Sequence, residues 1–402
     1  MAVLFALAGV GASGVARADV EETEARLKSA GVDAGLRARV HTAIGRAVEF
    51  LVAQQDARGR FRAQSHRVGS TLLAALALRH AGTGPTVEPV ARTQAYLFGD
   101  KADVRAVREM EEKVYCASLA LLFLQAIDRR APEAPVLAAG LSRALDPIHG
   151  AWGYDIPPPT SRSAFAALRP NLSTSQFAAL GLWAAARMGV AVPAQTWRAH
   201  AASLIEAQRG GASPYWPRTF PAGENDPYLC GTAMGVANLL LARQALAATK
   251  GGSPDRGALD AAIQRGLAAL RRDAPPMLAK PATYPLWPKA WVKGGLVSQE
   301  PGMGPYYALY AIEKACVFAD VESLGGRPWY ASMADWLCST QAADGGWTSL
   351  WDGERSGESD VVETSFALLI LVRAPQTSHP TTPRLPDARP RGPVTGEPAP
   401  PK

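Results

Sequence analysis

The sequence predicts an all-α fold in which about six helical hairpins close into a ring, an α/α toroid. Ala and Leu dominate the 402 residues, and runs of β-branched residues are few, which favours helix over strand. Strongly apolar segments alternate with amphipathic ones along most of the chain. A glycine-containing turn with an aromatic residue joins several of these pairs, most clearly in the stretch Thr-Gln-Ala-Ala-Asp-Gly-Gly-Trp at 340–347.

The apolar segments are predicted to form the inner helices of the ring. They are apolar nearly all round, so we expect them to be buried. Four of them open with a hydroxyl-x-x-small pattern, in which the hydroxyl is predicted to cap the helix start and the small residue to permit close packing. The pattern begins at Thr71, Ser175, Thr232 and Thr364, and the segments are 70–81, 115–127, 173–188, 231–246, 305–318 and 361–373.

The amphipathic segments are predicted to form the outer helices. Arg and Glu interrupt their apolar stripes, as at Arg39, Arg46 and Glu49, so one face should meet solvent. Their alternation with the apolar segments predicts inner helices that line a ring and outer helices that wrap it. These segments are 36–55, 87–98, 135–145, 194–208, 258–273 and 329–341.

The turns between outer and inner helices carry many of the aromatic residues. Glycine permits a tight turn, Gln can bond free backbone groups at a helix end, and Trp can cover the turn with apolar surface. For Trp152 and Trp347 we favour this sealing role. Long insertions at 155–172, 210–229 and 274–304 also separate outer from inner helices, and loops of such length are often functional.

The two ends of the chain differ in composition from the helical part. Residues 1–18 form a short apolar stretch ending in Ala-Arg-Ala, which predicts a signal peptide cleaved before Asp19. A lead-in at 19–35, a toroid at 36–375 and a disordered tail at 376–402, with eight prolines, would follow. We therefore expect a periplasmic or extracellular protein. The mature chain is predicted to have no transmembrane span, which leaves peripheral membrane association open.

Charge, cysteines and histidines exclude several classes of partner. The net charge of +6 comes from scattered Arg rather than from a cluster interleaved with aromatics, which argues against nucleic acid. Cys116, Cys230, Cys316 and Cys338 could pair in an exported protein, but buried free thiols are preferred because three lie in apolar helical stretches. The scattered histidines show no metal-binding spacing, so neither a metal nor another cofactor is expected.

Four segments carry a resemblance to a known family: 171–183, 305–313, 329–347 and 362–371. Over about 36–373 the chain resembles the prenyltransferase and squalene-oxidase repeat group, and within it squalene-cyclase-like secreted bacterial proteins of unknown role. The resemblance implies the toroid. The activities of the group are not supported in the same way, because the sequence has no Asp-x-Asp-Asp cyclase acid, no Asp-x-Cys zinc pair and no Cys-Gly-Glu-Gln thioester run.

Two acidic residues before and within the last inner helix are the candidate catalytic groups. Asp360 and Glu363 could form an acid if buried together, or could be charges favoured at a helix N-terminus. A toroid that processes glycans would instead need two carboxylates across a cleft, for which the sequence offers Glu224, Asp226, Glu300, Asp360 and Glu363 without pairing any of them.

Aromatic residues supply the candidate ligand site. Aromatic rims bind sugars, terpenoid chains or cations. We expect a non-catalytic protein that binds a hydrophobic, glycan or protein ligand in the ring. A divergent terpene cyclase with Asp360 or Glu363 as its acid is the alternative, and a glycan-processing enzyme is the third. The predicted ligand-binding residues are Trp287, Trp291, Tyr306, Tyr307, Trp216, Asp226 and Tyr228.

Overall fold

A computed structural model of the chain describes most of the predicted toroid. The described residues are 23–62, 67–82, 86–127, 131–158, 170–209, 216, 229–247, 256–279, 305–351 and 354–372, with backbone only at 209, 349–351 and 354–359. The predicted signal peptide and tail lie outside these residues. Residues 23–29 form a short helix before the first hairpin, and Arg26 Nη1 in this helix donates to the carbonyl of Val372, 3.3 Å away.

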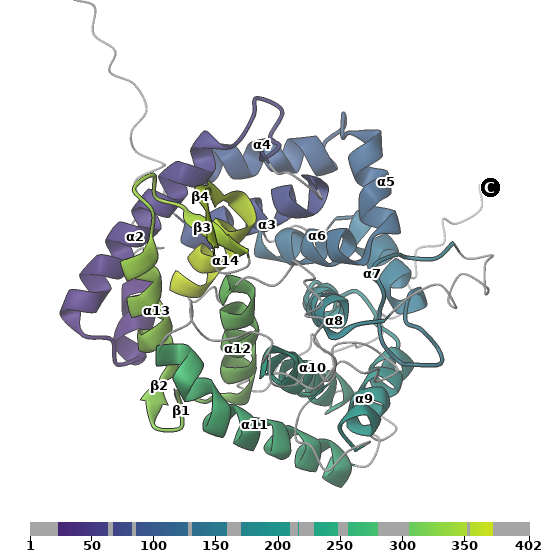
Figure 1. Ribbon diagram of the computed structural model, residues 1–402. Coiled ribbons are helices and arrows are strands. Elements are labelled where there is room, and N and C mark those ends of the chain that lie inside the picture. The colour runs from purple at the N-terminus through teal and green to yellow at the C-terminus, as the bar shows by residue number, and fades with distance from the viewer. Residues whose placement is uncertain are drawn as a thin grey trace, which may run out of the picture.

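Six inner helices form a closed ring, which confirms the predicted α/α toroid (Figure 1). Each packs on the next in chain order, and the last packs on the first. Each inner helix follows an outer helix in the chain and leads back to the next outer one, so the inner helices all begin at the same end of the ring, which we call the entry end. The inner helices are α3 (Arg67–Ala81), α6 (Val114–Ala126), α8 (Leu172–Arg187), α10 (Leu229–Ala247), α12 (Pro305–Ala319) and α14 (Val361–Leu371).

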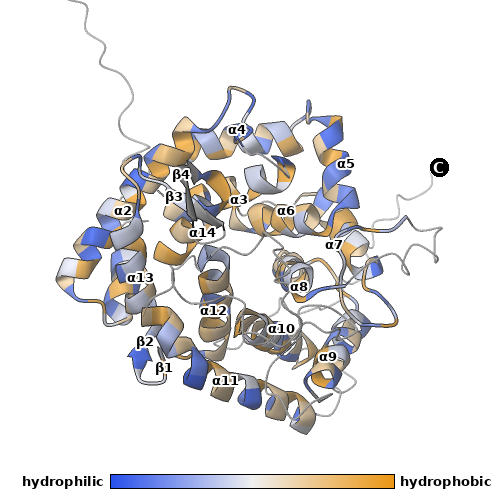
Figure 2. Ribbon diagram, in the orientation of Figure 1, coloured by the Kyte–Doolittle hydropathy of each residue, from blue (hydrophilic) through white to orange (hydrophobic). Residues whose placement is uncertain are grey.

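The outer helices surround this ring, and hydrophilic residues recur along them (Figure 2). The second hairpin has two outer helices, α4 and α5. The sequence did not predict α5 because only Ala106 and Met110 of it are buried. The outer helices are α2 (Ala34–Ala53), α4 (Val87–Phe98), α5 (Val104–Glu112), α7 (Glu133–Arg143), α9 (Ala194–Arg209), α11 (Arg256–Ala279) and α13 (Trp329–Thr340).

Helix α11 continues past its predicted end at Asp273 and includes Pro275 and Pro276. Proline removes the hydrogen bond to the carbonyl four residues earlier, which for Pro275 is that of Arg271. Gly325 lies directly against this carbonyl, since a Cβ there would come within 2.5 Å of its oxygen. The backbone of the connection from α12 to α13 therefore covers the break in the helix.

Two short antiparallel hairpins, which the sequence did not predict, follow α12 and α13. The first pairs β1 (Ser323–Leu324) with β2 (Arg327–Pro328), and the second pairs β3 (Trp347–Trp351) with β4 (Glu354–Asp360). In the second hairpin Trp347 lies opposite Asp360. This pairing brings the start of α14 back to the turn that ends α13.

The tryptophans of the turns seal them from within, as predicted for Trp152 and Trp347. Trp152, Trp216 and Trp347 are wholly buried. Each indole N–H donates to a carbonyl of the preceding outer helix, at 2.7 Å to Leu141, 2.8 Å to Leu204 and 3.0 Å to Leu337 respectively. The aromatic residue therefore replaces water at the helix end with a buried hydrogen bond and apolar surface.

The hydroxyl-x-x-small pattern has a different role from the predicted helix cap. Ser175 accepts the backbone N–H of Trp152 at 3.1 Å, and Thr364 accepts that of Trp347 at 3.0 Å. The caps are made further upstream, where Asn171 caps α8 and Asp360 caps α14. The prediction that these hydroxyls cap the helix start is wrong, because each lies inside the helix and faces the turn.

One type of contact joins a hairpin to the next at three places around the ring, after α2, α9 and α13. At the end of α2, Gln55 Nε2 donates to the carbonyl of Pro89 in the next outer helix, 2.8 Å away. In return, Arg92 Nε donates to Gln55 Oε1 at 2.9 Å. A Cβ on Gly59 would lie 2.5 Å from the carbonyl oxygen of Arg92, so this close approach needs glycine.

The same contact closes the ring, because the turn after α13 docks on the first outer helix, α2. Gln341 Nε2 donates to the carbonyls of Ala43, at 2.9 Å, and Gly345, at 2.8 Å. Arg46 Nη2 donates to the carbonyl of Ala343 at 3.0 Å. The turn after α9 uses Gln208 on the carbonyl of Ala262, at 3.2 Å. Glutamine at the end of an outer helix thus sets the spacing of neighbouring hairpins.

The cysteines are all free, and Cys116, Cys230 and Cys316 are buried, as preferred from the sequence. One described helix, α10, is long and apolar enough to cross a membrane, but 83% of that stretch is buried within the protein. Such burial is what the core helix of a ring shows.

Replacing Gly345 with alanine tests how closely the ring closes. Gly345 has φ +91°, and a Cβ there would lie 2.4 Å from the Arg46 carbonyl oxygen. Gly189 is the matched control, because it has φ +84° but nothing within 4 Å of a Cβ. Left-handed backbone costs alanine about 1–2 kcal/mol at either site, and overpacking adds about 1–3 kcal/mol at 345 alone.

We therefore expect Gly345→Ala to lower the free energy of unfolding in urea by more than Gly189→Ala does. Equal losses in the two variants would show that the close approach at Gly345 contributes nothing to stability.

Candidate binding site at the centre of the ring

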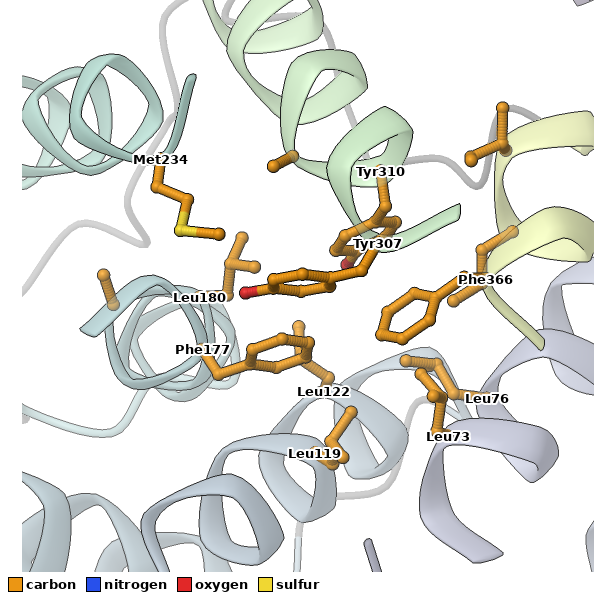
Figure 3. Close-up of a cluster of buried hydrophobic side chains, with 14 of the residues drawn as sticks. Leu73, Leu76, Leu119, Leu122, Phe177, Leu180, Met234, Tyr307, Tyr310 and Phe366 are labelled. Atoms are coloured by element: carbon orange, nitrogen blue, oxygen red, sulfur yellow. The ribbon is translucent and has the colours of Figure 1, made fainter. Parts of the chain in front are cut away.

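Apolar and aromatic side chains from all six inner helices converge on the centre of the ring (Figure 3). All of these side chains are buried. They belong to one continuous hydrophobic cluster, so the ring encloses a packed centre. They are Leu73 and Leu76 of α3, Leu119 and Leu122 of α6, Phe177 and Leu180 of α8, Met234 of α10, Tyr307 and Tyr310 of α12, and Phe366 of α14.

Four of these residues form an aromatic cluster across the ring. Phe177 stacks on Tyr307 with ring centroids 6.1 Å apart and planes 13° apart. The ring centroid of Phe366 lies 5.3 Å from that of Tyr307 and 5.2 Å from that of Tyr310. Contacts at these distances and angles are favourable for aromatic pairs. The cluster presents flat apolar faces at the one place where six helices meet.

A chain of buried polar groups crosses the ring beside this cluster. Tyr307 of α12 donates its hydroxyl proton to Gln176 Oε1 of α8, 3.3 Å away. Ser173 Oγ lies 2.9 Å from the same hydroxyl and is also hydrogen-bonded to the hydroxyl of Tyr115 on α6. Gln176 is wholly buried, and its Nε2 has no partner among the described residues. Of this chain only Tyr307 was predicted from the sequence. The signal for Ser173 and Gln176 was a polar start, Ser-Thr-Ser-Gln, in an otherwise apolar inner helix.

Asp360 serves as the N-cap of α14. Its Oδ1 accepts the backbone N–H groups of Val362, at 2.7 Å, and Glu363, at 3.2 Å. A carboxylate in this position is stabilised by the helix dipole. Of the two roles that the sequence left open for Asp360, the structure therefore shows the helix-terminal one.

Glu363 is in a different environment. It lies three residues before Phe366 on α14, and residues three apart share a helix face, so it belongs on the inward side, nearer the entry end. The side chain as a whole is half-buried, but its Oε2 is buried and has no hydrogen-bond partner among the described residues. Burial, with a smaller contribution from Asp360, raises the pKa of Glu363 to about 8. At neutral pH it is therefore a neutral carboxylic acid that can donate a hydrogen bond.

Of the three predicted ligand-binding residues that the structure describes, Tyr307 lies at the ring centre and the other two do not. Tyr306, one residue away, faces the outer helix α13 and packs on Trp336 with centroids 5.4 Å apart. Trp216 is wedged against Gly235 and Gly266 and has no exposed surface. The remaining candidates, Trp287, Trp291, Asp226 and Tyr228, lie outside the described residues, as do the acids Glu224 and Glu300.

A buried ion pair lies one turn further along α12. Lys314 Nζ is 2.7 Å from Glu313 Oε2, and the same ammonium lies 4.5 Å from the centroid of the Tyr310 ring. Both side chains are almost fully buried. The cation is therefore neutralised by its neighbour and stabilised by the face of an aromatic residue of the central cluster.

Two further observations limit where a ligand could bind. Among the described residues, no group of His, Cys, Asp and Glu is arranged to hold a metal ion. A surface groove of about 770 Å³ lies between α7 and the connection from α8 to α9, and is lined mostly by alanine and proline. It has no charged or aromatic side chain and is remote from the acids, so the ring centre is the better candidate.

The architecture places the chain in the class of α/α-toroid proteins, and the comparisons with known structures agree. No protein-family model and no curated protein matches the sequence. Among solved structures it is similar to the type II terpene cyclase MstE from Scytonema, determined as a point variant in complex with its product, merosterolic acid A. The identity is 13%, the TM-score 0.52, and the match covers 85% of this chain and 98% of that one.

Two glycan-related toroids are similar to the same extent. The α-1,6-mannanase GH76A of Salegentibacter sp. HEL1_6, with bound α-1,6-mannotetrose, has 11% identity and a TM-score of 0.52, covering 83% of this chain and 98% of that one. A possible member of the GH105 family from Salmonella enterica has 10% identity and a TM-score of 0.54, covering 84% and 93%. At such identities the likeness establishes the fold alone.

The raised pKa of Glu363 predicts that stability falls as pH rises. An unfolded Glu titrates near its ordinary value of 4.5, whereas the native one holds its proton to about 8. The contribution is therefore complete below pH 4.5 and is lost as pH rises through 8. At about 1.4 kcal/mol per pKa unit, we expect the free energy of unfolding to fall by roughly 2–4 kcal/mol across this window.

Urea titrations at several pH values would measure this slope. Glu363→Gln should flatten it, because the amide does not titrate. Glu49→Gln is the control, since Glu49 is exposed on α2 and should leave the slope unchanged. An identical slope in wild type and Glu363→Gln would show that Glu363 is ionised in the folded protein.

Proposed function

We propose that this protein is an exported, non-catalytic α-toroid that binds an apolar, terpenoid-type compound at the centre of its ring. The observation that carries the proposal is the aromatic cluster of Phe177, Tyr307, Tyr310 and Phe366, crossed by a chain of neutral polar groups. Flat aromatic faces with a few placed hydrogen-bonding groups are typical of sites for apolar ring compounds. Similarity to a terpene cyclase with bound product is compatible with such a ligand.

The packing of the ring centre decides how a ligand would enter. Phe177, Tyr307 and Phe366 are 2%, 6% and 7% exposed, so their own side chains fill the centre. A ligand must therefore rotate these side chains aside and take over their aromatic contacts. Tyr307 blocks the ring centre most directly, because its side chain extends from α12 and its hydroxyl is hydrogen-bonded to α8.

The acids argue for binding rather than cyclisation. Protonating an alkene requires a strong acid, and Asp360 instead accepts two backbone N–H groups as a helix cap. Glu363 carries a proton at neutral pH, but a pKa raised to about 8 makes it a weaker acid than an ordinary carboxyl group. The cyclase alternative therefore has no acid of suitable strength among the described residues.

Native mass spectrometry and lipid extraction of the protein purified from its own exported compartment test the proposal. We expect a co-purifying terpenoid-type compound, released unchanged after prolonged incubation. Phe366→Ala should weaken its retention at least tenfold by removing a central aromatic face. Phe98→Ala is the control, because Phe98 is similarly buried, at 5% against 7%, but stacks on Phe123 behind the ring.

Both Phe→Ala variants should lose about 3–5 kcal/mol of stability. The two variants should therefore differ only in how strongly they retain the ligand. If the protein carries and binds no such compound, or if the two variants lose it equally, the aromatic cluster serves only to pack the core and the proposed binding site is wrong.

Glycan hydrolysis is the second candidate function, and one observation favours it. A general acid for glycoside cleavage must be protonated near neutral pH, which is the state that burial gives Glu363. Released reducing ends from α-1,6-mannotetrose, lost in Glu363→Gln and falling in rate above about pH 8, would establish this function. Absence of turnover by wild-type protein across a panel of oligosaccharides would remove it.

A further inference from the structure

The carboxamide of Gln176 differs from the other buried glutamines of the ring. Gln208 is almost equally buried, but its Nε2 donates to the carbonyl of Ala262 at 3.2 Å. The half-buried Gln55 and Gln341 each donate to backbone carbonyls of a neighbouring outer helix. Gln176 is 0% exposed, and its Nε2 has no partner among the described residues. Two N–H groups beside the ring centre are therefore unused.

The hydrogen-bond chain that ends at Gln176 has one direction. Tyr307 gives its single hydroxyl proton to Gln176 Oε1, so its oxygen accepts from Ser173. Ser173 then has no proton left for Tyr115, whose hydroxyl must donate to it. Each donation polarises the next group, and the last group polarised is the Gln176 amide. Its N–H groups are thereby stronger donors than those of an isolated amide.

A buried donor without an acceptor is costly to maintain, since it forfeits the hydrogen bonds that water would supply. An oxygen atom of a bound ligand would restore them. The groups of the hydrogen-bonded chain are an amide and three hydroxyls, all neutral, and the nearby Lys314 ammonium is already paired with Glu313. An uncharged oxygen therefore suits the site better than a carboxylate, which would be buried without a free counter-charge.

We propose that Gln176 is the specificity-determining donor of the ring-centre site and selects oxygenated terpenoids, such as alcohols, ketones and ethers, over the parent hydrocarbons. This inference rests on the proposed function, because it requires a ligand at the ring centre. It adds that the ligand carries an oxygen acceptor and that this oxygen lies at the end of the Tyr115–Ser173–Tyr307 chain.

Farnesol and farnesene form the test pair, because they share one carbon skeleton and farnesene, formally farnesol less one water, has an additional C=C bond in place of the hydroxyl group. Isothermal titration of the full chain should give about tenfold tighter binding of farnesol, as expected for one hydrogen bond to a buried donor. Gln176→Met keeps the size of the side chain and removes the donors, so the two affinities should become equal. Gln244→Met is the matched control: Gln244 Oε1 also accepts from an aromatic side chain, the indole N–H of Trp183 at 3.1 Å, but lies near the far end of α10.

The methyl ether of farnesol tests the same idea on wild-type protein alone, so that the result does not depend on the variant folding. The ether accepts a hydrogen bond but cannot donate one, and it should keep most of the preference over farnesene. Equal affinity of wild type for farnesol and farnesene, or a preference that survives Gln176→Met, would overturn the role of Gln176 and leave the ring-centre site standing. Failure of wild type to bind any of the three would overturn both.

Discussion

The fold depends on the contact between each glutamine-ended turn and the next outer helix. A single side chain amide reaches across to a carbonyl of the neighbouring hairpin, as Gln55 does to Pro89 and Gln341 to Ala43. Glycine lets the two backbones approach closely, and an Arg from the neighbouring helix bonds the glutamine or its turn. Because the contact recurs after α2, after α9 and, between the last hairpin and the first, after α13, it fixes the spacing of the hairpins that it joins. The inner helices then have to meet at a common centre.

Much of this architecture could be predicted from the sequence, because inner and outer helices differ in pattern. A helix that packs on both sides is apolar all round, whereas one that meets solvent has a stripe, and this difference located every inner helix to within about three residues. Helix α5 was not predicted because it buries only two side chains. The β3–β4 hairpin was not predicted because its pairing places Trp347 opposite Asp360. Such a contact leaves no periodic pattern of apolar residues in the sequence.

The candidate site could be predicted less well, and the reason lies in the same apolar pattern. When a helix is buried all round, periodicity does not say which face looks inward. Tyr306 and Tyr307 are neighbours in an inner helix, and only the second reaches the centre, while Tyr306 packs on Trp336 behind the ring. Phe177 and Phe366 were not predicted for the same reason. In the sequence they resemble ordinary core residues, and only the closed ring shows that they contact Tyr307 at its centre. The acids Asp360 and Glu363 were found because charge is rare at an inner helix start.

A ring of six helices has a centre that must be filled, and how it is filled indicates what it can do. Leucines alone would fill it at no polar cost. This protein instead places a hydroxyl chain and an amide beside the aromatics, with a carboxyl group one turn away on α14, and leaves polar atoms such as Gln176 Nε2 and Glu363 Oε2 without partners among the described residues. Each such atom lowers stability relative to an apolar side chain of the same shape. Polar groups that cost stability and seal no turn are better explained by a ligand that completes them than by packing.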